Sequence, residues 1–249
     1  MWQPGWPATL EVKGVECPGG PPDQGDSAAR RRAAETGPVT QRNMVKEGYW
    51  YGLPLLLAAG GLMGLRLYAA SAFFILLALL VLNFFRDPDR QVPSNPHAIV
   101  APADGRVVEI KSETVEGQGF RRISIFMSPL DVHVNRSPIA GTVRNVCYRK
   151  GAFRIASRDL ASLENEQNVF TIEGERGAVM VKQIAGLLAR RIVFWKRPGD
   201  RLERGERVGL IKFGSRVDVL VDPAVELQVM VGDHVRAGSS ILGTTRTDA

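Results

Sequence analysis

The ten residues Ile211–Leu220, IKFGSRVDVL, hold the clearest strand pattern of the chain and also its clearest interruption. Apolar and polar side chains alternate on both sides of the break, and this period of two indicates a half-buried β-strand. The alternating apolar positions are Ile211, Phe213, Val217, Val219 and Val221. Gly214 interrupts the strand, and a glycine there marks a bend or a close approach of another group. Ser215 is therefore either part of a bulge or a nucleophile on a strained turn.

Short strands of the same kind recur through the second half of the chain, separated by turn residues at intervals of roughly ten residues. This spacing is typical of a sandwich or barrel built from small strands. The predicted strands are GRVVEI (105–110), RRISIFM (121–127), GTVRNVCYR (141–149), NVFTIEG (168–174), AVMVKQIAG (178–186), RIVFW (191–195), RVGLIKF (207–213) and VDVLV (217–221). We therefore expect residues 87–249 to form one mainly β domain, with a helix near Arg158–Glu166.

A faint internal repeat lies in the same region. GDRLERG at Gly199–Gly205 matches GDHVRAG at Gly232–Gly238, and each reads as a Gly-Asp turn, a short apolar step and a second glycine. The repeat predicts two similar turn-and-strand units and carries no chemistry by itself.

Two different segments precede the β domain. Residues 1–43 are rich in Pro, Gly and Arg and lack apolar periodicity, so we expect a disordered extension. The organised part of the chain begins at Met44, a residue at which synthesis could start. Whether residues 1–43 belong to the protein in the cell is therefore left open.

Residues 44–86 are predicted to form a membrane-associated hydrophobic segment. Tyr49–Phe85 contains a single charged residue, Arg66, and a spanning helix needs about 20 apolar residues. The segment is either a helical hairpin with Arg66 near its tip or one span with an interfacial lead-in. Basic residues precede and follow it, which favours cytoplasmic placement of both ends.

The composition is moderately basic, with a net charge of +6 and a pI of about 9.6. Such a balance suits an anionic membrane surface, and no aromatic-basic platform supports nucleic-acid binding. The two cysteines, Cys17 and Cys147, are far apart and predict neither a disulfide framework nor a metal site. They are consistent with a reducing compartment.

Two further stretches hold most of the reactive side chains. APADGRV contains Asp104 before a glycine, which is either a strand-opening turn or a functional carboxylate. MSPLDVHVNRSP places Asp131, His133 and Arg136 within six residues. His133 is either a structural histidine or a general acid/base, and Arg136 is either a surface charge or an anion-binding group.

The chain carries three motifs in order behind an apolar segment: APADG, MSPLDVHVNR and FGSRVD. This combination resembles the phosphatidylserine decarboxylases of the short bacterial and archaeal branch. The resemblance covers roughly Lys46–Gly243. It implies a proenzyme that cuts itself between Gly214 and Ser215. The products would be a β chain (1–214) and an α chain (215–249) that stay together as a heterodimer.

The resemblance also implies the chemistry. Ser215 would become a pyruvoyl group, the covalent cofactor, which forms a Schiff base with the amine of phosphatidylserine and promotes loss of CO2. The product would be phosphatidylethanolamine, made without a metal at the cytoplasmic face of the cell membrane. Two alternatives stay open: the same reaction on archaetidylserine, or a membrane-tethered β-barrel module without activity.

By the same resemblance, Asp104 corresponds to the aspartate of a maturation relay, and His133 to the first histidine of the family motif. Arg136 stands where the longer branch has a second histidine. We therefore expect His133 as general acid/base, Asp104 as the residue that orients it, and Arg136 as a ligand for the substrate carboxylate or phosphate.

Overall fold

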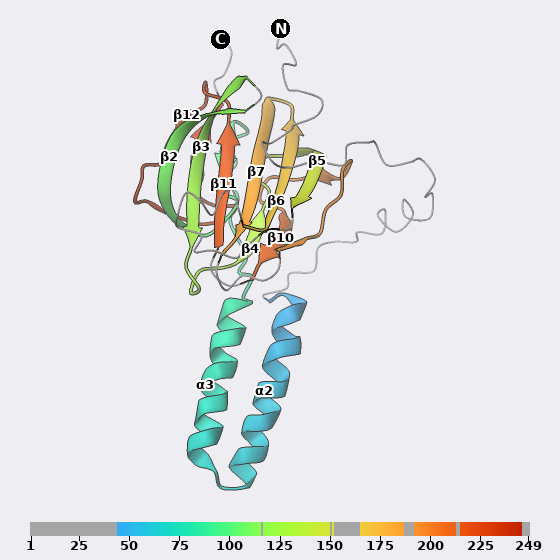
Figure 1. Cartoon of the computed structure of the whole chain (residues 1–249), viewed down its shortest axis with the longest axis vertical. Helices are drawn as coiled ribbons and strands as arrows, with labels where there is room; N and C mark the ends of the chain where they lie inside the picture. Colours follow the sequence, from blue (N-terminus) through green and yellow to red (C-terminus); the bar gives the residue numbers. More distant parts are fainter. Residues whose placement is uncertain are drawn as a thin grey trace, which may run out of the picture.

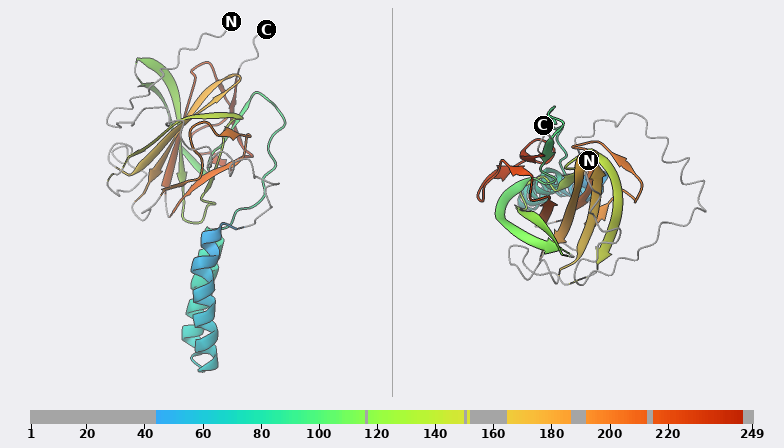
Figure 2. Two further views of the ribbon diagram at one scale, coloured as in Figure 1. Left: turned by 90° about the vertical axis from the view of Figure 1, so that its right-hand side faces the viewer. Right: turned by 90° about the horizontal axis from the view of Figure 1, so that it is seen from above.

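The computed structural model describes residues 44–115, 117–149, 151, 165–186, 192–212 and 215–245. A β domain lies at one end of the molecule and a pair of helices projects from it (Figures 1 and 2). The predicted extension over residues 1–43 and almost all of the helix predicted near Arg158–Glu166 lie outside the described residues.

The hydrophobic segment folds into two helices, α2 (Lys46–Gly64) and α3 (Tyr68–Phe84), which lie side by side. The hydroxyl of Ser71 donates a hydrogen bond to the Ala59 carbonyl at 2.8 Å and ties the two helices together. Arg66 lies in the turn between them and adopts a φ of 60°. At the other end, the backbone N–H of Val45 donates to the carbonyl of Phe85 at 3.1 Å, which closes the pair.

Within the described ranges, no helix combines the length and the apolar character needed to cross a membrane. The turn at Arg66 divides the apolar run into α2, which has 19 residues, and α3, which has 17.

The largest β element is a curled sheet of eight strands, in the order β13-β2-β3-β11-β7-β6-β5-β9. All of its neighbouring strands are antiparallel. Its strands are β2 (Gly105–Val115), β3 (Gln118–Met127), β5 (Gly141–Arg149), β6 (Gln167–Gly174), β7 (Gly177–Ala185), β9 (Arg201–Leu202), β11 (Ser215–Val221) and β13 (His234–Val235). The mainly β prediction is confirmed, and β11 occupies the middle of the sheet.

Two three-stranded sheets complete the domain, in the orders β1-β14-β12 and β4-β10-β8. Their strands are β1 (Ala98–Val100), β4 (Val134–Arg136), β8 (Ile192–Phe194), β10 (Arg207–Ile211), β12 (Glu226–Leu227) and β14 (Ile241–Thr244). The main apolar core joins side chains of the curled sheet, such as Ile125, Val181 and Val219, to Leu242 and Ile211 of the small sheets. The layers are therefore held together by burial of apolar area.

The internal repeat forms the two edges of the curled sheet, since β9 and β13 carry its apolar steps. The second glycine of each copy has a positive φ, 79° at Gly205 and 76° at Gly238, a conformation that favours glycine. Each also donates its N–H at 2.8 Å, Gly205 to the carbonyl of Ser137 and Gly238 to that of Ala101. The two copies of the repeat thus form equivalent glycine turns at opposite edges of the curled sheet.

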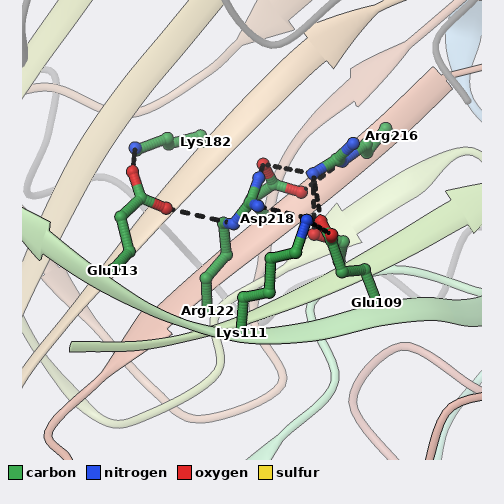
Figure 3. A network of polar contacts seen from close by, with 8 residues as sticks. Glu109, Lys111, Glu113, Arg122, Lys182, Arg216 and Asp218 are labelled. Atoms are coloured by element: carbon green, nitrogen blue, oxygen red, sulfur yellow. Dashed lines mark hydrogen bonds and ion pairs between the residues drawn. The ribbon is translucent and has the colours of Figure 1, made fainter. Parts of the chain in front are cut away.

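The strand β11 is buried on both faces, and the prediction of a half-buried strand is wrong in this respect. On the face opposite the main core, Arg216 donates to Asp218 at 2.6 Å and to the hydroxyl of Ser124 at 2.8 Å. A network of charged side chains surrounds this pair (Figure 3). Its other members are Glu109, Lys111, Glu113, Arg122 and Lys182. The polar alternation seen in the sequence is therefore an enclosed ion-pair network and not a solvated face.

Replacing Asp218 by Asn tests the importance of this network. The change removes the nearest negative charge from a buried guanidinium, and breaking a buried pair from one side costs about 3 kcal/mol. We expect that loss in the free energy of unfolding, measured by urea titration in a Ser215→Ala background that keeps the chain in one piece. The control is Asp222→Asn, an exposed aspartate just after the same strand, which should change stability by less than about 0.5 kcal/mol. Equal effects of the two changes would contradict a stabilising role for the network.

Candidate active site

Ser215 is the first residue of β11, and its backbone pairs with Met127 of β3 on one side and Ala185 of β7 on the other. Its side chain is fully buried, and the hydroxyl lies 3.2 Å from the Met127 sulfur. A thioether is a weak acceptor, so among the described residues the hydroxyl has no strong hydrogen bond to give up on reaction. The fold therefore holds this oxygen in a dry and well-defined position. Gly214, the other predicted cleavage residue, lies outside the described residues.

His133 lies just before β4 and is also buried. Its Nδ1 is 2.9 Å from the carbonyl oxygen of Asp131, so Nδ1 carries the hydrogen and Nε2 carries the lone pair. Nε2 is buried and has no hydrogen-bond partner among the described residues. Burial lowers the pKa of this imidazole to about 4, and it outweighs the raising effect of the Asp131 carbonyl. The side chain is thus a neutral imidazole with a free basic nitrogen.

The end of the helical pair forms one wall of the site. The ring of Phe84, the last residue of α3, packs against the His133 ring with centroids 4.2 Å apart. Phe84 and Phe85 also pack with Leu210 of β10. The apolar contact explains why the imidazole stays desolvated, and it attaches the helices to the β domain at this point.

Strand pairing brings the His133 segment and the Ser215 segment to the same end of the domain. The backbone N–H of Ile211 donates to the His133 carbonyl at 3.3 Å, and Ser215 follows four residues later. In Figure 1, β4, β10 and the starting end of β11 lie together at the end nearest the helices. Two of the predicted catalytic residues are thus placed on neighbouring segments.

Asp104 lies just before β2 in a different set of contacts. Its carboxylate accepts the backbone N–H of Ala237 at 2.8 Å and pairs with Arg90 at 2.6 Å. Burial raises the pKa of Asp104, although the Ala237 N–H and the Arg90 charge act in the opposite direction. In the described part of the chain, no hydrogen bond joins Asp104 to His133. The orienting contact on the imidazole comes instead from a main-chain carbonyl, that of Asp131.

Arg136, at the end of β4, is buried, and its guanidinium already donates hydrogen bonds to other groups of the protein. Its guanidinium donates to Asp87 at 2.8 Å, to the Pro88 carbonyl at 3.0 Å and to the Gly205 carbonyl at 3.1 Å. Burial lowers its pKa, with the Asp87 carboxylate acting against this shift. The contacts tie the segment after α3 to the edge of the β domain. Substrate binding by Arg136 stays a prediction, and it would require these donors to be shared.

Three buried amides near Ser215 were not singled out from the sequence. Asn168 donates to Gln183, Gln183 donates to Asn135, and Asn135 approaches the Met127 sulfur that contacts Ser215. Asn135 stands two residues after His133, and that proximity was the signal in the sequence. Gln183 and Asn168 lie on separate strands and had no such signal.

A cavity of 1110 Å³ lies away from these residues, between the turn after β6 and the strands β1 and β9. Ser215, His133, Asp104 and Arg136 do not line it. This cavity therefore coincides with none of the site residues predicted from the sequence.

The chain is similar to known proteins over most of its length. The sequence model of the family described as phosphatidylserine decarboxylase matches residues 77–243, which include all the site residues above. The phosphatidylserine decarboxylase proenzyme of Solibacter usitatus is 52% identical over 199 residues, which cover 80% of this chain and 95% of the relative. The proenzyme of Geobacter sulfurreducens is 45% identical over 194 residues, covering 77% and 89%. That of Salinibacter ruber is 47% identical over 205 residues, covering 80% and 83%. The chain belongs to the phosphatidylserine decarboxylase family.

Proposed function

We propose that this chain is a proenzyme that cuts itself between Gly214 and Ser215 and then decarboxylates phosphatidylserine to phosphatidylethanolamine. The observation that carries the proposal is the position of Ser215. Its hydroxyl is buried at the start of the central strand, directly after a glycine and close to the segment that holds a neutral, unpaired imidazole.

The first step uses only groups of this chain. The Ser215 hydroxyl adds to the Gly214 carbonyl carbon, and the C–N bond breaks to leave an ester and a free amine at residue 215. The Nε2 lone pair of His133 is our candidate base for the hydroxyl proton, because the neutral form of this imidazole predominates at neutral pH. The backbone of Ser215 is held on both sides by β3 and β7, which favours a single attack geometry.

The second step removes the α-hydrogen of Ser215 and expels the Gly214 carboxylate. The resulting dehydroalanine takes up water and releases ammonia. A pyruvoyl group formed in this way from Ser215 supplies an electron-accepting carbonyl for the amine of the lipid. The buried position of the Ser215 side chain and the neutral imidazole of His133 fit such a group, because neither adds a competing charge.

The two products of the cut would remain one folded unit. The strand β11 keeps its pairing with β3 and β7 after its N-terminal bond is broken, and the Arg216–Asp218 pair lies wholly within the α chain. We therefore infer an α/β heterodimer held together by the curled sheet.

The helical pair is the proposed contact with the membrane. Large apolar side chains face outward along both helices, for example Leu57, which is 71% exposed, and Leu76, which is 68% exposed. Exposed apolar side chains that gather along both helices in this way mark an interaction surface. The site lies at the same end of the domain, so a lipid head group would reach it without leaving the bilayer surface. The basic residues on either side of the helices support a cytoplasmic location of the β domain.

Replacing Ser215 by Ala should abolish the cut. We expect intact mass spectrometry to find only the full-length chain in the variant, because the attacking oxygen is gone. The wild type should yield a fragment that begins at residue 215, reacts with borohydride as a carbonyl compound and resists Edman degradation. The matched control is Ser137→Ala, a second buried serine, which should mature normally. A full-length wild-type chain that performs its cellular role would instead support a binding module.

The protonation state of His133 gives a pH-dependent signature in stability. Its pKa is about 4 in the folded chain against about 6.5 unfolded, so between these values the unfolded state binds more protons and stability falls as the pH is lowered. Between pH 7 and pH 5 the loss from this group is about 2 kcal/mol. We expect urea unfolding of Ser215→Ala to show that loss, and the double variant with His133→Asn to lack it. An identical pH dependence in both chains would mean that His133 is not buried as a neutral group.

Membrane contact is tested by placing charges on the helical pair. The double variant Leu57→Asp/Leu76→Asp should bind vesicles of phosphatidylglycerol and phosphatidylethanolamine at least about tenfold more weakly, because it removes two exposed apolar groups and adds like charge. Co-sedimentation measures this. Val108→Asp, an exposed apolar residue on β2, serves as the control and should bind like the wild type. Unchanged binding of the double variant would refute the helices as the contact.

A further inference from the structure

Three amide side chains form a directed chain of hydrogen bonds in the interior. Asn168 of β6 donates from Nδ2 to Oε1 of Gln183 at 2.8 Å, and Gln183 of β7 donates from Nε2 to Oδ1 of Asn135 at 2.7 Å. All three side chains are at most 1% exposed. Each amide nitrogen therefore donates to the oxygen of the next amide, and the chain runs from the curled sheet toward β4.

The last donor in this chain, Nδ2 of Asn135, has no strong acceptor in the ranges that the structure describes. The hydrogen bond recorded for Nδ2 of Asn135 goes to the Met127 sulfur at 3.8 Å, and a thioether accepts weakly. The same sulfur lies 3.2 Å from the Ser215 hydroxyl. The amide hydrogens of Asn135 and the oxygen of Ser215 thus approach one atom from different strands.

Such an arrangement is unusual inside a protein, because buried donors normally find an acceptor. The hydrogen bonds from Asn168 to Gln183 and from Gln183 to Asn135 also polarise the Asn135 amide. The low dielectric of the interior strengthens this polarisation at the Asn135 nitrogen. A fully buried amide that is held by its oxygen and makes only a weak hydrogen bond through its nitrogen is therefore ready to donate to a negative charge that forms nearby.

The cleavage step proposed above creates that charge at one atom. When a base removes the α-hydrogen of Ser215, the electron pair forms the Cα–Cβ double bond and the Cβ–Oγ bond breaks. Oγ then leaves as an oxygen of the Gly214 carboxylate and gains negative charge as the bond breaks. A donor placed beside Oγ accelerates this step, whereas it contributes little to the earlier attack, in which charge develops on the carbonyl oxygen.

We propose that Asn135 donates its Nδ2 hydrogen to the leaving Oγ of Ser215 during self-cleavage, with Gln183 and Asn168 as positioning residues that fix the direction of its amide. The inference rests on the proposed self-cleavage and adds the group that assists its second step. Asn135 and His133 stand two residues apart, so the donor and the neutral imidazole come from one short segment.

The test separates the two steps of the cut. Asn135→Leu, which keeps the volume and removes the donor, should slow maturation about 100-fold, as expected for the loss of one donor to a developing oxyanion. Gln183→Met, which leaves Asn135 in place without its anchor, should slow it about tenfold. Thr171→Val is the control, a buried polar residue of β6 outside the amide chain, and should mature at the wild-type rate. The rates come from time courses of the fragment beginning at residue 215 after cell-free synthesis of the full chain.

The chemical state of the uncut chain provides the second readout. If only the elimination is slowed, the ester accumulates, and neutral hydroxylamine should split both slow variants into a Gly214 hydroxamate and a fragment that starts with an intact Ser215. A chain that is merely misfolded has no ester and would not be split. Wild-type maturation rates in both variants, or slow variants that resist hydroxylamine, would overturn the role of Asn135. A wild-type chain that is never cut would instead overturn the proposed function itself.

Discussion

The enclosure of β11 is the constraint on which the rest of the site depends. The strand is paired along both edges, and both of its faces are buried, one by the apolar core and the other by the network around Arg216 and Asp218. Because a buried ion pair tolerates little displacement, it holds the register of the strand. The first residue, Ser215, is consequently placed by seven residues of rigid sheet and not by a mobile loop.

The recorded contact of the Ser215 hydroxyl is an uncharged thioether, and a buried chain of amides reaches the same sulfur. The paired charges of Asp104 with Arg90 and of Arg136 with Asp87 brace other strands and the segment after α3. A buried environment of this kind strengthens every interaction with a charge that develops during reaction.

The helical pair and the site are parts of one structure. Phe84 ends α3 and packs on His133, so the element with the large exposed apolar surface also desolvates the imidazole. The same contact orients the β domain relative to the helices. A protein that acts on a two-chain lipid needs both functions, and a single aromatic side chain joins them here.

The sequence by itself determined the strands and the order of the motifs, because period-two alternation and short motifs are local properties of the chain. The roles of Ser215, His133 and Asp104 follow from the family resemblance and stay predictions. The contact of Phe84 with His133 and that of Gln183 with Asn135 could not be predicted, because each joins elements that are far apart in the sequence. The alternation at Arg216 and Asp218 predicted a solvated face, and only the folded structure covers it. The single apolar run of Tyr49–Phe85 likewise left the turn at Arg66 undecided. Tertiary structure decided which polar groups are buried, and burial in turn set the pKa of His133 and the direction of the amide chain.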